Sequence, residues 1–240
     1  MSIIVECEST SDRRNFLKLV GGAGAVASIL PFAGTVSAAE MHNHAAVAAV
    51  SRVAENQPPR SEKAWQAAAV QRDLWVGHIF WIRNVSFATL NKNDAAAETA
   101  EQQVVANLHS IAGTIEPFYG AGAKGSFFKL LAGHYGAVKA YLVATADGNA
   151  TAQATATESI TSNAEDIAVF LSKANPYLPK DTLYSVLLAH GAHHIQQILE
   201  LKDRKYESEA RTWEDMKNHV YQVADATADA LAKQFPEAFE

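Results

Sequence analysis

Four histidines fall on the apolar faces of predicted helices, and imidazole is the side chain in this sequence best suited to hold a transition metal. His190 and His194 are four residues apart, so both project from the same face of one helix. His78 and His134 each lie near the middle of another helix. The pattern predicts a zinc, copper or iron site with His78, His134, His190 and His194 as ligands.

A structural role for the same histidines is the main alternative. A single histidine on an apolar face is more often a core residue that hydrogen-bonds an ordinary neighbour. Four of them on three helices favour the metal hypothesis, but a cofactor-free bundle with core histidines stays open. Of the remaining histidines, His193 points away from His190 on the same helix and is expected to be exposed. His109 and His219 have no predicted partner.

Carboxylates do not complete a familiar di-iron site. Ferritin-like proteins use Glu-x-x-His on two helices, and the apolar faces of this chain carry no such motif. The nearest acidic candidates are Glu165, Asp166 and Asp225. Each of these carboxylates is expected to lie on a solvated face. If the histidines bind a metal, the three carboxylates are the first candidates for the groups that orient the imidazole rings.

Trp75, Trp81 and Arg83 surround His78 in the sequence. Aromatic residues at helical spacing usually pack in a core, and an arginine beside them can pair with a nearby carboxylate. A pocket floored by tryptophans would also suit a flat cofactor. The three residues are therefore candidate contacts for a non-covalent b-type haem, a second alternative to the metal ion.

The elements that position these side chains are predicted to be helices throughout. No segment shows sustained alternation of apolar and polar residues, and Gly, Pro and Asn mark the breaks. The segment from Phe118 to Gly125 is predicted to form a turn. The predicted helices cover residues 61–90, 94–115, 125–146 and 151–173, then a helix that starts near 179 and a last one at about 208–234. No strong breaker marks the boundary between the last two helices. We expect an all-α fold, an antiparallel bundle of four to six helices over residues 61–240.

Composition excludes several kinds of chemistry. The single cysteine, Cys7, lies in a segment that is predicted to be removed. Without it, disulfides, iron–sulfur clusters, cysteine-ligated copper and covalently attached haem are excluded. The formal net charge of −6 argues against nucleic acid as a partner, because that interaction needs a basic surface. Homo-oligomerisation stays open.

The first 38 residues have the features of an export signal. The run from Ser11 to Lys18, with its arginine pair followed by Asn, Phe and Leu, resembles the signature read by the twin-arginine translocase. A weakly apolar stretch and a small-x-small cleavage motif follow, with the cut after Ala38 or Ala39. Residues 39–60 are predicted to be a flexible linker. The mature protein is therefore expected to be periplasmic or otherwise exported, with no membrane span.

Several short motifs resemble a bacterial family of small helical proteins. They are Leu74-Trp75-x-x-His78-x-x-Trp81-x-Arg83, Pro117-Phe118-Tyr119-Gly120, Asn175-Pro176-Tyr177 and Lys233-Gln234-Phe235-Pro236. The resemblance covers residues 63–239. It implies a helical fold, adds weight to His78, His134 and His190, and implies no activity.

The leading prediction is thus an exported helical bundle that binds a transition metal through interior histidines, for metal handling or a modest redox role. The alternatives are a cofactor-free protein that binds other envelope components, and a b-type haem binder. No nucleophile, base and orienting group can be assembled from the spacings, so a hydrolase is not expected.

Overall fold

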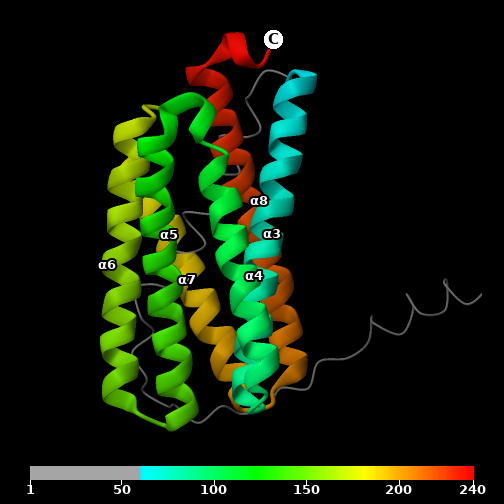
Figure 1. Ribbon diagram of the computed structural model, residues 1–240, viewed down its shortest axis with the longest axis vertical. Helices are drawn as coiled ribbons and strands as arrows, with labels where there is room; N and C mark the ends of the chain where they lie inside the picture. Colours follow the sequence, from blue (N-terminus) through cyan, green and yellow to red (C-terminus); the bar gives the residue numbers. More distant parts are fainter. Residues whose placement is uncertain (1–59) are drawn as a thin grey trace, which may run out of the picture. The chain divides into compact units, whose positions relative to one another are not determined.

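The computed structural model describes residues 60–240, and within that range the predicted all-α bundle is confirmed. The described residues form six α-helices and one short 3-10 helix, with no strand. The α-helices pack side by side (Figure 1). Their bounds are Glu62–Leu90 (α3), Asp94–Gly113 (α4), Glu116–Asp147 (α5), Ala150–Ala174 (α6), Lys180–Lys202 (α7) and Tyr206–Gln234 (α8), followed by the 3-10 helix η1, Pro236–Ala238.

The predicted turn between Phe118 and Gly125 is wrong. Helix α5 begins at Glu116, so the glycine-rich segment is helical except at Gly120, whose φ of 80° and ψ of 171° kink the chain. That conformation is essentially restricted to glycine. The kink lets one extra helical turn form ahead of the long part of α5, because the chain resumes helical geometry immediately after it. Glycine here changes the direction of a helix and does not end it.

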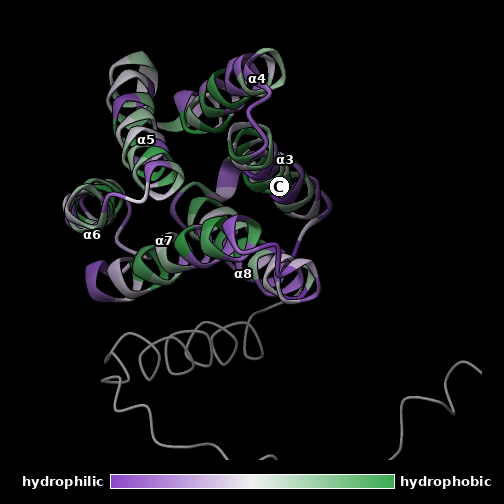
Figure 2. Ribbon diagram, turned by 90° about the horizontal axis from the view of Figure 1, so that it is seen from below, coloured by the Kyte–Doolittle hydropathy of each residue, from purple (hydrophilic) through white to green (hydrophobic). Residues whose placement is uncertain are grey.

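The helices alternate in direction. Consecutive helices are joined by short connections, so α3, α5 and α7 run one way and α4, α6 and α8 run the other (Figure 1). Each of α3, α5 and α7 contacts the other two, and each also contacts the helices next to it in the chain. Figure 2 looks along the bundle and shows the six helices end on. The three parallel helices therefore meet around a common axis.

The three helical hairpins α3–α4, α5–α6 and α7–α8 repeat at one interval of 56 residues. In each hairpin the link between the two helices contains one residue with positive φ: Lys92 (58°), Gly148 (68°) and Arg204 (59°). In the first two hairpins the next residue is an asparagine whose side chain caps the second helix, Asn93 to Ala96 N–H and Asn149 to Ala152 N–H. The links are equivalent because the same geometry recurs at the same interval.

A hydrogen bond between the two helices of each hairpin repeats at the same interval. In every case a side chain of the second helix donates to a backbone carbonyl of the first helix, 33 residues earlier. The bonds are Asn107 Nδ2 to the Leu74 carbonyl at 2.9 Å, Asn163 Nδ2 to the Leu130 carbonyl at 3.0 Å, and His219 Nε2 to the Val186 carbonyl at 3.1 Å. The bundle is thus a pseudo-threefold repeat of one helical hairpin.

Glycine permits the asparagine bonds. A Cβ on Gly77 would lie 3.1 Å from the Asn107 amide nitrogen, and a Cβ on Gly133 would lie 3.1 Å from that of Asn163. Both distances are tighter than ordinary van der Waals contact. Each glycine directly precedes a histidine of interest, His78 or His134. The close packing of the two helices therefore fixes the depth at which each histidine enters the interior.

Three of the motifs that carry the family resemblance meet at one end of the bundle. The Tyr119 hydroxyl donates to Gln234 Oε1 at 2.6 Å, and Asn175 Nδ2 lies 3.2 Å from the same hydroxyl. Gln234 Nε2 in turn donates to the Ala174 carbonyl at 3.1 Å. Segments far apart in the sequence thus form one hydrogen-bonded cap across the ends of α5, α6 and α8.

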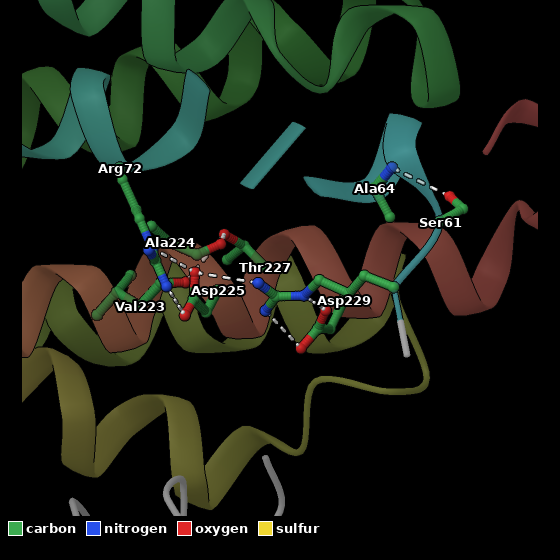
Figure 3. A network of polar contacts seen from close by, with 9 residues as sticks. Ser61, Ala64, Arg72, Val223, Ala224, Asp225, Thr227 and Asp229 are labelled. Carbon is green, nitrogen blue, oxygen red and sulfur yellow. Dashed lines mark hydrogen bonds and ion pairs between the residues drawn. The ribbon is translucent and has the colours of Figure 1, made fainter. Parts of the chain in front are cut away.

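Two ion pairs join α3, and the residue that precedes its cap, to α8 (Figure 3). Arg72 on α3 binds both carboxylate oxygens of Asp225 on α8, at 2.8 and 2.5 Å. Arg60 binds Asp229 in the same two-pronged way, at 2.6 and 2.9 Å. Paired hydrogen bonds of this kind are directional and set the relative position of the two helices. Arg60 is the last residue of the predicted linker, and it is held by α8.

The rest of the predicted linker and the predicted signal peptide, residues 1–59, lie outside the described residues. From residue 60 onward, none of the helices has the combination of length and apolar character that a membrane span needs.

Candidate metal centre

The three hairpins place one histidine each at equivalent positions on the pseudo-threefold axis. His78 of α3, His134 of α5 and His190 of α7 follow one another at the 56-residue interval. His194 lies one turn further along α7. Ligand atoms of these four residues all lie within 4.8 Å of one another. The fold thus brings together the four histidines that the sequence put forward; metal ligation itself stays a prediction.

His194 breaks the symmetry. Its equivalents in the first two hairpins are Ile82 and Val138, both buried. The layer of His78, His134 and His190 is therefore flanked on one side by a layer that contains two aliphatic side chains and one imidazole. The fourth histidine approaches the other three from that side only.

The rings are packed closely enough to share one ion. His190 Nε2 and His194 Nε2 are 3.2 Å apart. The ring centroids of His78, His134 and His190 are 5.4 to 6.3 Å apart, with the rings tilted or stacked on one another. Four nitrogens at 2.0–2.1 Å from a tetrahedral zinc ion would be roughly 3.3 Å apart. With one ligand atom of each residue within 4.8 Å of the others, the four rings are close enough that they could hold one ion.

Most of the ring nitrogens lack hydrogen-bond partners although the four side chains are buried, His78 and His194 to 1% exposure. Five nitrogens are without a partner: both of His78, Nε2 of His134, and Nδ1 of His190 and His194. A buried polar atom without a partner costs about 1–3 kcal/mol. Such a concentration of unpaired ring nitrogens in neighbouring side chains is compatible with metal binding.

Burial also sets the charge state. It lowers the pKa of His78 to about 3, with a further contribution from the neighbouring His134, and lowers that of His134 to about 4. The pKa values of His190 and His194 lie well below 6.5, because both rings are desolvated and surrounded by other imidazoles. All four rings are thus neutral at pH 7, the state that a metal ion requires of its ligands.

None of the three candidate carboxylates hydrogen-bonds a ring of these histidines. Asp225 accepts from Arg72, and Glu165 accepts from Lys180 at an exposed site. The expected solvated position is observed for Glu165 and Asp166, whereas Asp225 is half-buried in its ion pair with Arg72.

The candidate haem contacts do not form one pocket. Trp75 lies at the histidines, with its ring centroid 5.6 Å from that of His78 and 6.1 Å from that of His190. Trp81 instead packs on Phe80. Arg83 binds both oxygens of Glu209, at 2.5 and 2.6 Å. Of the three, only Trp75 packs against the candidate metal ligands.

Sequence reasoning missed His219 and misplaced His193. His219 is buried, and its ring lies 6.0 Å from that of His190 and 5.3 Å from that of His193. His193 is half-buried against it, not exposed as expected. The sequence did contain a signal for His219, because it follows Asn107 and Asn163 at the 56-residue interval. Aligning the chain with itself at that interval would have identified His219 as the equivalent of the two asparagines, whereas its bond to the Val186 carbonyl is seen only in the structure.

A comparison of the chain with protein-family models, with curated proteins and with solved structures finds no match.

Proposed function

We propose that this protein binds one transition-metal ion through His78, His134, His190 and His194, and that its role is metal handling or a modest redox reaction. The observation that carries the proposal is the set of five unpaired ring nitrogens on these four neighbouring, buried histidines. A bound ion would take up one nitrogen from each ring at once and so reduce the cost of burying the four rings.

The pseudo-symmetry suggests the coordination geometry. His78, His134 and His190 would supply three ligands from equivalent positions around the axis, and His194 would supply a fourth from one side. The opposite side of the ion would then face the part of the axis lined by Trp75, where a further ligand has room to bind. Three protein ligands with one position left for water or substrate are typical of a catalytic zinc site, whereas four protein ligands are typical of a structural one.

Ligand chemistry narrows the choice of metal. Four neutral imidazoles suit zinc, copper or iron, whereas magnesium and calcium prefer oxygen ligands. Copper or iron would permit one-electron chemistry in a layer that is shielded from water. Zinc would make the site a store, a carrier or a Lewis acid.

A cofactor-free bundle is the second candidate, and one observation favours it. His190 and His194 pair with each other at 3.2 Å, so two of the rings find a hydrogen bond without a metal. The pairing satisfies only one nitrogen of each ring and leaves both nitrogens of His78 unpaired. This candidate therefore accounts for less of the layer than the metal does.

Elemental analysis of protein purified without chelators or a histidine tag tests the proposal. We expect one equivalent of zinc, copper or iron per chain, and loss of that metal in His134→Ala. The matched control is His109→Ala, because His109 is exposed and lies on another helix. Wild-type protein that neither retains nor takes up any of these metals would favour the cofactor-free bundle, and a Soret band would point to haem.

We also propose that the protein is exported through the twin-arginine pathway, which carries proteins in the folded state. This route would allow the metal to be inserted before transport. The support is the sequence of residues 11–38. Replacing Arg13 and Arg14 by lysine is expected to leave the precursor in the cytoplasm, as followed by cell fractionation. Normal export of this variant would rule out the route and leave the metal proposal untouched.

A further inference from the structure

An apolar cavity lies on the pseudo-threefold axis directly against the histidine layer. It is lined by His78, His134 and His190, and then by successive sets of equivalent residues on the side of the layer away from His194. These sets are Trp75, Leu131 and Leu187; Gln71, Phe127 and Leu183; and Ile111, Ile167 and Val223. The cavity thus begins where the proposed metal ion would have its remaining position.

The polar groups at the two ends of the cavity differ in whether they have hydrogen-bond partners. At the far end they are paired: Gln71 donates to Thr114 at 3.0 Å, and Asn175 donates to the Ala230 carbonyl at 3.0 Å. At the histidine end, the indole N–H of Trp75 is buried and has no acceptor. An indole N–H can only donate. An oxygen atom of a ligand would therefore fit at the histidine end, and the apolar remainder of the cavity would fit a hydrocarbon chain.

The dimensions suit a single extended chain. Along α8 the lining runs from Val223 to Leu231, a rise of roughly 12 Å over eight residues. The cavity volume is only about 60 Å³, which is small for a lining of that length. A narrow space of this kind suits an unbranched alkyl chain better than a ring system, and at about 1.3 Å per bond the length corresponds to about ten carbons.

We infer that the cavity binds a linear aliphatic molecule of about ten carbons with one uncharged oxygen group, of which a primary alcohol is the simplest. The chain lies along the axis, and the oxygen lies in the histidine layer beside the Trp75 N–H. No lysine, arginine or carboxylate lines the cavity, so an uncharged head group is favoured over a carboxylate. The contact between oxygen and metal rests on the proposed function, but the binding of the chain does not.

A series of n-alkanols tests the chain. Metal-free protein is titrated with 1-butanol to 1-tetradecanol by calorimetry. Affinity is expected to rise about fourfold for each added methylene, from about 0.8 kcal/mol per buried CH₂, and to stop rising near ten carbons. The branched, thicker 2-ethyl-1-hexanol should bind more weakly than 1-octanol. Affinity that does not depend on chain length, or that continues to rise through fourteen carbons, would overturn the inference.

Substitutions test the position of the oxygen. Trp75→Phe removes the indole donor and should weaken 1-octanol binding about fivefold to tenfold, the loss of one hydrogen bond. Trp81→Phe is the matched control, since Trp81 is on the same helix but does not line the cavity; its affinity for 1-octanol should equal that of the wild type. Equal weakening by both substitutions would overturn the placement of the head group.

The visible spectrum of cobalt-loaded protein tests whether the oxygen of the bound alcohol reaches the proposed metal ion. In Co²⁺-loaded protein, 1-octanol should change the visible absorption of the cobalt over the same concentration range in which it binds. Saturation of the protein with no change in that spectrum would show that the oxygen does not reach the metal layer and would overturn the placement. If the protein takes up no metal but the alkanol series behaves as expected, the proposed function fails and the cavity remains a site for aliphatic chains.

Discussion

The third hairpin, α7–α8, differs from the first two at the positions that matter for chemistry. All three hairpins share the left-handed link, the bond between their helices and a histidine on the axis. The third alone has histidine where the others have Ile82 and Val138, and histidine where the others have Asn107 and Asn163. The shared residues build the scaffold, whereas His194 and His219 add titratable groups to one third of it.

The first prediction concerns acid stability, where the third hairpin should dominate. Burial lowers the pKa of His219 to about 4. The pKa values of this residue and of the four axial histidines are all below 6.5, the value in the unfolded chain. Between about pH 6.5 and pH 4 the unfolded chain therefore binds more protons than the folded one, and stability falls as the pH falls. Because His78 and His134 are protonated at pH 5 only in the unfolded chain, each should lower the free energy of unfolding by about 2 kcal/mol at that pH.

Denaturant titrations of metal-free protein at pH 7, 6 and 5 measure this effect. A free energy of unfolding that is constant from pH 7 to pH 5 would contradict the neutral, buried layer.

The second prediction compares the three equivalent histidines. Replacing His78, His134 or His190 by alanine should weaken metal binding by more than about 100-fold in each case, because each supplies one of three symmetric ligands. Competition with a chromophoric chelator measures the affinities. If one of the three could be replaced without loss, the symmetric layer would not be the ligand set.

The third prediction concerns a variant that makes the third hairpin match the second at one position. His194→Val gives α7 the residue found at the equivalent position in α5 and leaves three axial histidines. We expect metal affinity to fall about 10- to 100-fold with one ion per chain retained. An affinity equal to that of the wild type would show that His194 belongs to the core and not to the site.

The fourth and smallest prediction concerns His219→Asn, which copies the first two hairpins. Asparagine can donate to the Val186 carbonyl as Asn163 donates to that of Leu130. Stability at pH 7 should change by less than about 1 kcal/mol, while the dependence of stability on pH between 6.5 and 4 becomes shallower by about one proton. Loss of folding at pH 7 would contradict the equivalence of the three bonds.

Local patterns in the sequence were enough for most of the helices. The Ser61 and Asn93 caps and the Asn175-Pro176 break place helix ends within a few residues of those observed. The segment around Gly120 was misread because a glycine-rich stretch usually marks a turn. In the folded protein, packing of the extra turn of α5 against the C-terminal residues outweighs that tendency, with Phe118 stacked on Phe239.

The candidate site was predictable in its residue types and only partly in its geometry. That His190 and His194 share a face follows from helical periodicity alone. The interval of 56 residues, also present in the sequence, is what sets His78, His134 and His190 at one depth. This interval is the strongest indication of the site in the sequence. It cannot be found from amino-acid composition or from the apolar faces of single helices.

Tertiary structure decided what lies beside the histidines. Whether a carboxylate orients an imidazole or pairs with an arginine depends on which helices are neighbours, and Asp225 faces Arg72 because α8 packs on α3. The cavity likewise exists only because α3, α5 and α7 meet around an axis on which the side chains leave space. Sequence by itself determined the helices, their apolar faces and the kind of ligand, since these follow from local periodicity and side-chain chemistry. The convergence of four rings on one point depends on contacts between residues more than 50 positions apart, and only the packed bundle determines those.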